Sequence, residues 1–406
     1  MVEINHQKST SDVERKSVAV VYQGCYPDPA GLMAGARRVR DLAQGIAEAN
    51  IQTWMLTPAH FVFGERSPQD RFEVVHLGND QPIPTLASRM AFWRGVYRFA
   101  TKKPIDSLLF YHTTIDSWST LRHLRKSGRF VALEVCDLFS TMNWKPWKKA
   151  FYKLAEIQLP KQTNLNVAIS SGIQGWLRST APRTPTMLVP GLFDCRDFKK
   201  DPTAGWAMRE RFGIHKNASL FVYSGSWFKI KGIETLMRSF AALKRTNPEC
   251  RLVITGRKTN ERFDANIPAL IDELQLHDSV IMTGFLDNAG MAAVLSGADV
   301  VVCPHDRHRF ADFAFPTKIA EYAGMGCCII ATDVGDVRLY LKDGMDAMIC
   351  PPQDIEAMAS GMRTLCSNPE LRCSMGINAR LAAERHFDYR KNGKILASAL
   401  LAQQIP

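Results

Sequence analysis

The feature that most constrains the fold of this chain is an alternation of short apolar strands and amphipathic helices that starts twice. The first run opens with a predicted strand at residues 18–22, a helix at 36–49 and a strand at 51–56. The second run opens with a strand at residues 220–224 and a helix at 233–243. Strands that alternate with helices form parallel sheets with helices on their faces. One large sheet would leave the second start unexplained, so we predict an α/β protein with two parallel-sheet domains.

Chain length agrees with two domains, because 406 residues exceed the size at which a single hydrophobic core stops growing. We predict an N-terminal domain over residues 1–188, a C-terminal domain over 189–380, and a closing segment over 381–406. The closing segment reads as a helix with one apolar face, and we expect it to pack back on the first domain. Further strands are predicted at residues 107–112, 130–135, 166–170, 186–189, 251–255, 280–283, 300–303 and 327–332.

Composition narrows the class of protein. The chain is 46% hydrophobic and 22% charged, as is ordinary for a globular protein, and has no apolar run of about 20 residues that could cross a bilayer. The first residues lack the apolar core of a signal peptide. The ten cysteines are scattered, without a C-x-x-C pair or a metal-ligand spacing with histidine. We therefore expect a cytoplasmic protein with reduced thiols.

The stretch from residue 313 to residue 341 contains a helix start with the features of a phosphate site. Pro316 suits the first helical position, and Thr317 and Lys318 then lie in the first turn, where free amides and the helix dipole attract anions. Glu321 follows one turn later, and its carboxylate can accept two hydrogen bonds from the hydroxyls of a ribose. The alternative is a surface helix with a Lys318–Glu321 pair.

Three more loops at strand ends of the second run carry groups suited to anions or to a base. The loop after residues 220–224 holds two lysines before a glycine and a helix, and the loop after 251–255 holds a glycine and an arginine. The loop after 280–283 could bind the edge of a base through its backbone. These loops contribute Gly225, Ser226, Lys229, Lys231, Gly256, Arg257, Gly284 and Phe285. We predict a bound nucleoside diphosphate; the alternatives are solvated loop lysines and a tight turn with a core phenylalanine.

The order of these segments resembles that of the nucleotide-sugar glycosyltransferases with two facing Rossmann-like domains, the GT-B class, and in particular the large retaining group 1, or family 4. The resemblance is carried by YSGSWFKIKGIETLMRSF, VITGR, VIMTGFLDNAGMAAVLSGADVVVCP, FPTKIAEYAGMGCCIIATDVGDV and KDGMDAMICPPQD, within residues 188–375. In the first half, GCYPDPAGLMAGARRVRDLAQGIAEANIQTWMLT and VAISSGIQGWL are similar, more loosely, to the opening loop and last strand of the family. The FPTK segment matches a P-[ST]-K variant of the donor-site helix.

The resemblance implies a GT-B architecture with an interdomain cleft, the donor in the second domain and the acceptor in the first. It implies that Lys231 contacts the donor pyrophosphate and that Glu321 binds the ribose. The remaining residues of the helix start, which would lie beside the phosphate or the sugar, are Phe315, Pro316, Thr317 and Lys318.

Two positions depart from the family pattern. Phe313 stands where many relatives carry a glutamate that touches the donor sugar, with Asp312 one step away. Ser226 stands where many relatives carry an arginine, so that Lys229 or Arg257 would have to supply the charge.

Candidates in the first domain are fewer. By the resemblance, Gly31 would let the loop after the first strand approach the donor closely, although an ordinary proline-rich turn is the alternative. The segment LEVCD lacks the histidine that many relatives place after this strand, which leaves Asp137 as the polar candidate or as a helix N-cap. His112 ends the preceding strand and could orient an acceptor hydroxyl, or be structural.

The net charge of +11 is concentrated in the first half, where residues 1–190 carry 24 Lys/Arg against 15 Asp/Glu. Basic and aromatic residues alternate at 91–103 and 143–153, which suits an anionic membrane surface. The alternative is a solvated helix whose aromatic side chains face the core. Nucleic acid is a less suitable partner, because no nucleic-acid-binding module accompanies the charge.

We therefore predict a glycosyltransferase that moves a hexose-type sugar from a UDP- or GDP-sugar to a carbohydrate or lipid-linked acceptor, in polysaccharide or glycoconjugate biosynthesis. The resemblance implies retention of anomeric configuration. No D-x-D triplet occurs, and we expect no metal or other cofactor. We expect a cytoplasmic location, with peripheral attachment to the inner face of the membrane as one form of it. The alternatives are a nucleotide-sugar epimerase of the same fold and a non-catalytic protein that binds sugar nucleotides or membranes.

Overall fold

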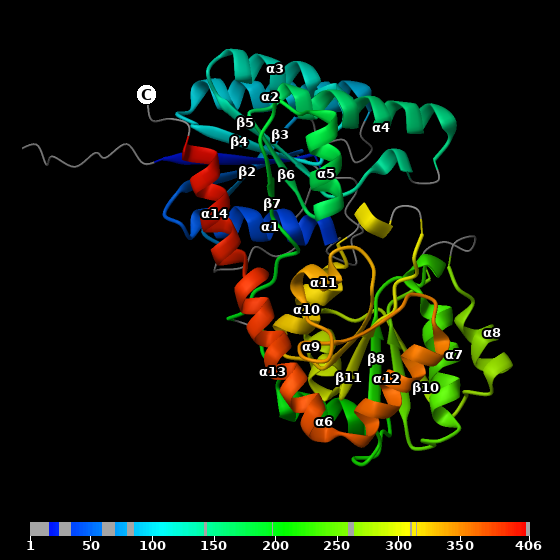
Figure 1. Ribbon diagram of the computed structural model, residues 1–406. Coiled ribbons are helices and arrows are strands. Elements are labelled where there is room, and N and C mark those ends of the chain that lie inside the picture. Colours follow the sequence, from blue (N-terminus) through cyan, green and yellow to red (C-terminus); the bar gives the residue numbers. More distant parts are fainter. Residues whose placement is uncertain are drawn as a thin grey trace, which may run out of the picture.

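The computed structural model describes residues 16–23, 34–58, 70–78, 85–141, 144–196, 198–258, 264–308, 311–313 and 315–402. These residues form two α/β domains, one above the other in Figure 1. Each domain is built on one sheet of parallel strands, with seven strands in the first sheet and six in the second. The prediction of two parallel-sheet domains is therefore confirmed.

The first sheet has the strand order β3-β2-β1-β4-β5-β6-β7. Its central strands are mostly apolar and buried along their whole length, as parallel strands under two layers of helices must be. In Figure 1, α2 and α3 lie above this sheet and α1 and α14 below it. The strands are β1 Ser17–Tyr22, β2 Gln52–Pro58, β3 Glu73–Leu77, β4 Ser107–Tyr111, β5 Phe130–Val135, β6 Leu165–Ala168 and β7 Thr186–Leu188, and the helices are α1 Ala34–Ala47, α2 Leu86–Lys102, α3 Trp118–Lys126, α4 Pro146–Gln158 and α5 Ser171–Thr180.

The second sheet has the order β10-β9-β8-β11-β12-β13. Helix α7 packs with α8 and α12, while α6 packs with α9 and α10 packs with α13. The strands are β8 Leu220–Ser224, β9 Arg251–Thr255, β10 Val280–Gly284, β11 Val300–Cys303, β12 Ile329–Thr332 and β13 Met348–Cys350. The helices that follow β7 in the chain are α6 Pro202–Arg211, α7 Ile233–Lys244, α8 Ile267–Leu274, α9 Asn288–Gly297, α10 Thr317–Gly324, α11 Val337–Tyr340, α12 Ile355–Ser367, α13 Pro369–His386 and α14 Tyr389–Leu401, of which α14 packs on the first domain.

Both sheets reverse their strand order at the same place, between β1 and β4 in the first and between β8 and β11 in the second. Ligands of open parallel sheets bind outside the carboxyl ends of the strands at such a reversal. In the second domain this point joins the loop after β8 to the loop after β11, although 75 or more residues separate the two strands in sequence. The strand order thus selects which loops can form a site together.

Two strands were not predicted. β3 (Glu73–Leu77) is an edge strand with a charged residue and a histidine among its five, and none of its residues is fully buried. β13 (Met348–Cys350) has only three residues. Neither shows a long apolar run or a clear alternation, so the periodicity of the sequence does not reveal them.

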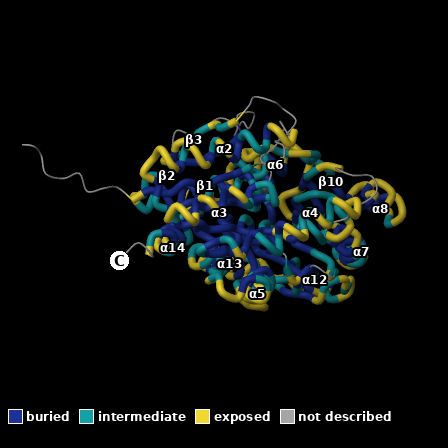
Figure 2. The backbone as a smooth tube through the Cα atoms, turned by 90° about the horizontal axis from the view of Figure 1, so that it is seen from above, coloured by how far each residue is buried: buried dark blue, intermediate teal, exposed yellow. Residues whose placement is uncertain are grey.

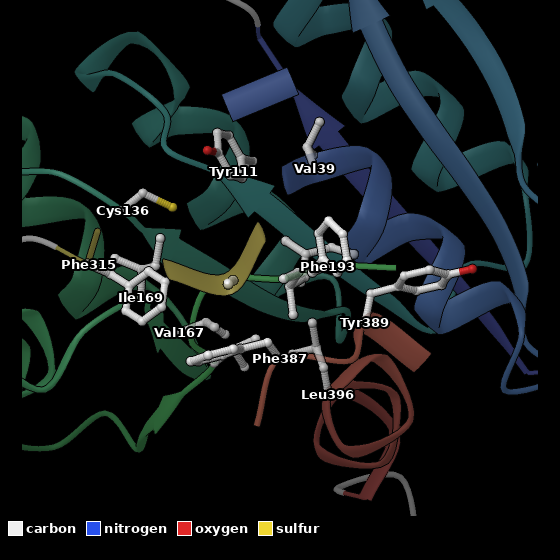
Figure 3. Packing of buried hydrophobic residues seen from close by; sticks show 14 of the residues in the cluster. Val39, Tyr111, Cys136, Val167, Ile169, Phe193, Phe315, Phe387, Tyr389 and Leu396 are labelled. Carbon is white, nitrogen blue, oxygen red and sulfur yellow. The ribbon is translucent and has the colours of Figure 1, made fainter. Parts of the chain in front are cut away.

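The chain crosses between the domains at two segments that lie side by side. Phe193 and Asp388 form a parallel bridge, in which the Phe193 N–H donates to the carbonyl of Phe387 at 2.8 Å. After the second crossing, α14 packs against α1, and a Cβ added to Gly393 would lie 2.4 Å from the Cα of Gly45. Figure 3 shows the apolar packing around this crossing, where the rings of Phe315 and Phe387 are 5.6 Å apart. The closing helix thus belongs to the first domain in space.

None of the helices in the described parts of the chain is long and apolar enough to cross a bilayer.

Candidate functional site

A cavity of about 170 Å³ lies at the strand-order reversal of the second sheet. Its walls come from the end of β8, the end of β11 and the start of α10. The lining residues are Tyr223, Ser224, Gly225, Ser226, Lys231, Val302, Cys303, Pro304, His305, Phe315, Thr317, Lys318 and Tyr322. Six residues predicted from the sequence are therefore brought together here: Gly225, Ser226, Lys231, Phe315, Thr317 and Lys318.

The start of α10 provides the anion-attracting side of this cavity. Thr317 and Lys318 are its first two residues, so free backbone N–H groups and the positive end of the helix dipole are beside them. Pro316 is the N-cap, and its ψ of 88° lies outside the helical range; the prediction that Pro316 is the first helical residue is wrong by one position. Pro316 still accepts a hydrogen bond, from the Ile319 N–H at 2.8 Å.

Lys231 reaches the cavity because of a tight turn after β8. Lys229–Lys231 form a 3₁₀ turn, and Gly232 ends it with a φ of +71°. A Cβ on Gly232 would lie 1.6 Å from the carbonyl oxygen of Pro304, so only glycine lets this loop touch the loop after β11. Burial lowers the pKa of Lys231, which shows an ammonium group partly stripped of water. Lys229, in contrast, is exposed and does not line the cavity.

Glu321 lies on α10 but does not line the cavity. Its carboxylate receives hydrogen bonds from Lys318 Nζ and from Arg37 of α1, each at 2.8 Å. Burial would raise the pKa of Glu321, but the two cations outweigh it and hold that pKa below the usual value. The group predicted to bind a ribose thus takes part in an ion pair between the two domains.

The other predicted donor loops lie at the adjoining strand ends. A Cβ on Gly256, after β9, would lie 1.9 Å from the carbonyl oxygen of Gly225, and the Gly256 N–H donates to the carbonyl of Gly284 at 2.9 Å. The Arg257 guanidinium lies over the ring of Phe285, 5.4 Å from its centre. Phe285 is half-exposed. These residues form one edge beside the cavity without lining it.

Asp137 of the first domain does not line the cavity but lies close enough to Lys231 for the two charges to interact. Its carboxyl is open to solvent but surrounded by protein atoms, which raises its pKa from 3.8 to about 6, and the nearby charge of Lys231 opposes this rise. Within the described contacts no hydrogen bond joins Asp137 to the 3₁₀ turn that follows at Phe139–Thr141. The N-cap alternative is therefore not what the structure shows.

His112 directly follows β4, which ends at Tyr111, and has a left-handed conformation with a φ of +40°. Its ring packs edge-on against Phe139, with centroids 4.0 Å apart, and Nδ1 accepts from the Cys136 N–H at 3.5 Å. Burial lowers its pKa to about 4, so the imidazole is neutral at neutral pH. These contacts are those of a packed side chain that supports the segment carrying Asp137. Gly31 lies outside the described residues.

Among the residues at or beside the cavity that were not predicted, His305, Tyr322 and Arg37 matter most for its chemistry. His305 follows β11, and burial holds its pKa well below the usual value. The Tyr322 hydroxyl accepts from the Ser224 N–H at 3.1 Å and so ties α10 to the end of β8. Arg37 pairs with Glu321 from the other domain. The strand-end rule could have identified His305, whereas Tyr322 and Arg37 give no local signal.

Phe313, at the position where the resemblance implies a glutamate, lies at the domain boundary. Its carbonyl accepts from the Ser170 hydroxyl at 2.8 Å, and the neighbouring Asp312 carbonyl lies against Gly172 of α5. This segment therefore holds the two domains together.

Residues 205–382 match the protein-family model described as Glycosyl transferases group 1. Among curated proteins, the alpha-D-kanosaminyltransferase of Streptomyces kanamyceticus is 29% identical over 172 residues, which are 42% of each chain. The D-inositol 3-phosphate glycosyltransferase of Xylanimonas cellulosilytica is 28% identical over 189 residues, 46% of this chain and 43% of the other. These matches span less than half the length of the relatives, and the match to the family model falls in the second domain of this chain.

Solved structures match over nearly the whole chain. Sucrose-phosphate synthase from Thermosynechococcus elongatus superposes with a TM-score of 0.73 at 20% identity, covering 95% of this chain and 98% of the other. HepE of Anabaena, in complex with UDP and glucose, superposes with a TM-score of 0.74 at 17% identity, covering 95% and 99%. The chain therefore has the two-domain GT-B fold, and its second domain carries the sequence pattern of glycosyl transferases group 1.

Proposed function

We propose that this protein is a glycosyltransferase that moves a hexose-type sugar from a nucleoside diphosphate sugar to an acceptor held by the first domain. The observation that carries the proposal is the cavity at the β8/β11 reversal, where Lys231, Lys318 and the free amides of α10 converge. Two lysines and a helix N-terminus suit a diphosphate. UDP is our first choice of nucleotide, because it is bound in a structural neighbour, with GDP as the second.

The proposed reaction breaks the bond between the anomeric carbon and the diphosphate oxygen. The electron pair leaves with the diphosphate, and negative charge grows on its oxygens. Lys231 and Lys318 would stabilise this charge more in the transition state than in the bound donor, which is what accelerates the step. The acceptor oxygen bonds to the anomeric carbon, and its proton passes to an oxygen of the departing phosphate. The positive charges that stabilise the departing diphosphate come from Lys231 and Lys318, so we propose that no metal is needed. From the resemblance, we also propose that the anomeric configuration is retained.

Asp137 is the proposed contact for the acceptor. It lies on the first domain, faces Lys231, and has a pKa of about 6, so it is mostly a carboxylate at neutral pH and can accept a hydrogen bond from an acceptor hydroxyl. His112, held neutral and packed on Phe139, would act by supporting this segment and not by touching the acceptor. Glu321 would bind the ribose after it gives up Arg37.

The test has two stages. In the first, UDP, GDP, ADP and their hexose derivatives are screened for an increase in melting temperature, because a ligand that binds only the native state stabilises it. In the second, the selected nucleotide sugar is incubated with and without carbohydrate and lipid-linked acceptors, in the presence and absence of a chelator. Release of the nucleoside diphosphate that depends on an acceptor and survives the chelator supports the proposal. Conversion to an isomeric nucleotide sugar without any acceptor indicates an epimerase, and binding without turnover indicates a non-catalytic protein.

A further inference from the structure

The first domain carries an amphipathic helix that is poorly covered by its own core. Only Ala155 of the 13 residues of α4 is buried. Trp147 is 68% exposed and Leu154 is 50% exposed. These two side chains are seven residues apart and so lie on the same side of the helix. A large indole and a leucine on the outer side of a helix indicate a partner that has both an apolar and a polar part.

Two exposed lysines lie beside this apolar row. Lys153 directly precedes Leu154, and Lys145, the N-cap of α4, lies two residues before Trp147. The Lys148 ammonium lies over the Trp144 ring, 3.7 Å from its centre. The one acid of the helix, Glu156, turns inward and accepts from the Ser140 N–H at 2.9 Å. The exposed charge of α4 is therefore positive throughout.

The neighbouring helices extend the positive surface. α2 lies beside α4, with the Arg89 guanidinium 5.8 Å from the centre of the Phe151 ring, and α3 packs on α2. Figure 1 shows α2, α3 and α4 on the side of the sheet away from α1 and α14, and Figure 2, seen from above, shows much of these helices coloured as exposed. Exposed cations on α2 and α3 are Arg94, Arg98, Lys102, Arg122, Arg125 and Lys126.

The two basic–aromatic segments of the sequence therefore differ. In residues 91–103 the rings of Phe92 and Trp93 are buried, and the Trp93 indole donates to Asp116 at 2.8 Å, so the two largest neighbouring rings of this segment face the core; Tyr97 is 37% exposed. In residues 143–153 Trp147 points outward and is 68% exposed. The second segment therefore offers the larger apolar side chain to a partner.

We propose that α4 docks the first domain on an anionic bilayer surface, with Trp147 and Leu154 at the level of the headgroups and the lysines on the lipid phosphates. Charge complementarity carries the choice of partner: an anionic bilayer offers negative headgroups above an apolar layer, and α4 presents lysines beside an apolar row. An acidic polysaccharide or a nucleic acid would use the lysines but leave Trp147 and Leu154 in water.

This surface is directly connected to the candidate acceptor residue. The Tyr152 ring of α4 packs against Phe139, two residues after Asp137, with centroids 5.4 Å apart. A bilayer on α4 would therefore bring a lipid-linked acceptor beside Asp137. This last step rests on the proposed function, whereas the docking does not, so vesicle binding is measured separately from turnover.

The test is co-sedimentation with vesicles of phosphatidylcholine, with or without about one third phosphatidylglycerol. We expect binding to the anionic vesicles only, with affinity falling as salt is raised. Each lysine near the surface contributes about fivefold, so the double change Lys145→Ala and Lys153→Ala should weaken binding roughly 25-fold. Trp147→Ala should weaken it roughly tenfold, since an indole leaves the interface.

The matched control removes the same charge from the second domain by Lys199→Ala and Lys216→Ala, two exposed positions. It should bind vesicles as the unchanged protein does. Melting temperatures and nucleotide affinities of all variants report whether the fold is kept. Equal binding to neutral vesicles, equal loss in the control variant, or retention on heparin without vesicle binding would each overturn the proposal. Vesicle binding without acceptor-dependent turnover would leave the docking standing and contradict the proposed function alone.

Discussion

Replacing Lys231 with alanine removes one of two ammonium groups from the cavity between β8 and β11. Burial already lowers the pKa of Lys231, so the free protein keeps this charge in a place where water solvates it poorly. A bound diphosphate would restore a strong partner to it. A hydrogen bond to a charged group contributes about 1.5–3 kcal/mol, which corresponds to a loss of roughly 13- to 160-fold in UDP affinity.

Coulomb's law gives a similar scale. Two unit charges about 4 Å apart interact by about 4 kcal/mol at an effective dielectric constant of about 20. Lys318 remains in the variant and moderates the loss, so we expect a value within the hydrogen-bond range. Calorimetric titration with UDP and with uridine is the assay. Uridine lacks the phosphates, so its affinity should change little.

Lys229→Ala is the control, because Lys229 is on the same turn but is exposed and outside the cavity. It should change UDP affinity by less than about threefold, as expected of a solvated surface charge. An equal loss for UDP and uridine would show that the substitution damaged the whole domain. A loss below about threefold for UDP in Lys231→Ala would refute the assignment of this lysine to the diphosphate.

Arg37→Ala should tighten UDP binding by up to about fivefold. Glu321 would no longer have to release Arg37, whose part-exposed ion pair contributes about 1 kcal/mol, before it binds a ribose. Unchanged or weaker UDP binding in calorimetry would count against a ribose-binding role for Glu321. Asp137→Asn should raise the melting temperature more at about pH 7.5 than at about pH 5, two values that lie on either side of the pKa of Asp137. The pKa of Asp137 in the folded protein is about 6 and lies above the ordinary 3.8, so folding favours the protonated carboxyl. The stability that this protonated carboxyl contributes is complete below pH 3.8 and is lost as the pH rises through about 6. A pH-independent difference would argue against the shifted pKa. Gly393→Ala should lower the free energy of unfolding in urea by roughly 1–3 kcal/mol, since its Cβ would lie 2.3 Å from a backbone carbon of α1. Gly175→Ala, which has open space around it, should not lower it. Similar urea midpoints for the two variants would contradict the close packing of α14 on α1.

The strands were predictable where burial is complete. β5, β8, β9 and β11 have the predicted bounds, because a strand covered on both faces appears as a short, mostly apolar run. Bounds shifted by one or two residues elsewhere, as at β12, which begins at Ile329 and not at residue 327. There the apolar pair Cys327 and Cys328 is buried outside the strand, and an apolar run does not distinguish the two cases.

The candidate site was predictable in its parts and not in its assembly. A lysine before a glycine at a strand end and a threonine–lysine pair at a helix start are local signals, and both line the cavity. Lys229, Pro316 and Glu321 carry the same local signals and do not line it. Side-chain direction after a turn depends on contacts such as that between Gly232 and Pro304, which lie about 70 residues apart in sequence.

By itself the sequence determined two α/β domains, the existence of anion-suited loops and the concentration of positive charge in the first half, because these follow from periodicity, residue type and composition. Only the tertiary structure decided which loops meet, that Arg37 engages Glu321 across the domains, and that Trp93 is buried while Trp147 is exposed. The physical reason is that apolar burial is non-directional and depends on long-range packing: which surfaces are covered is decided by strand order and by the return of α14, and not by any local stretch of chain.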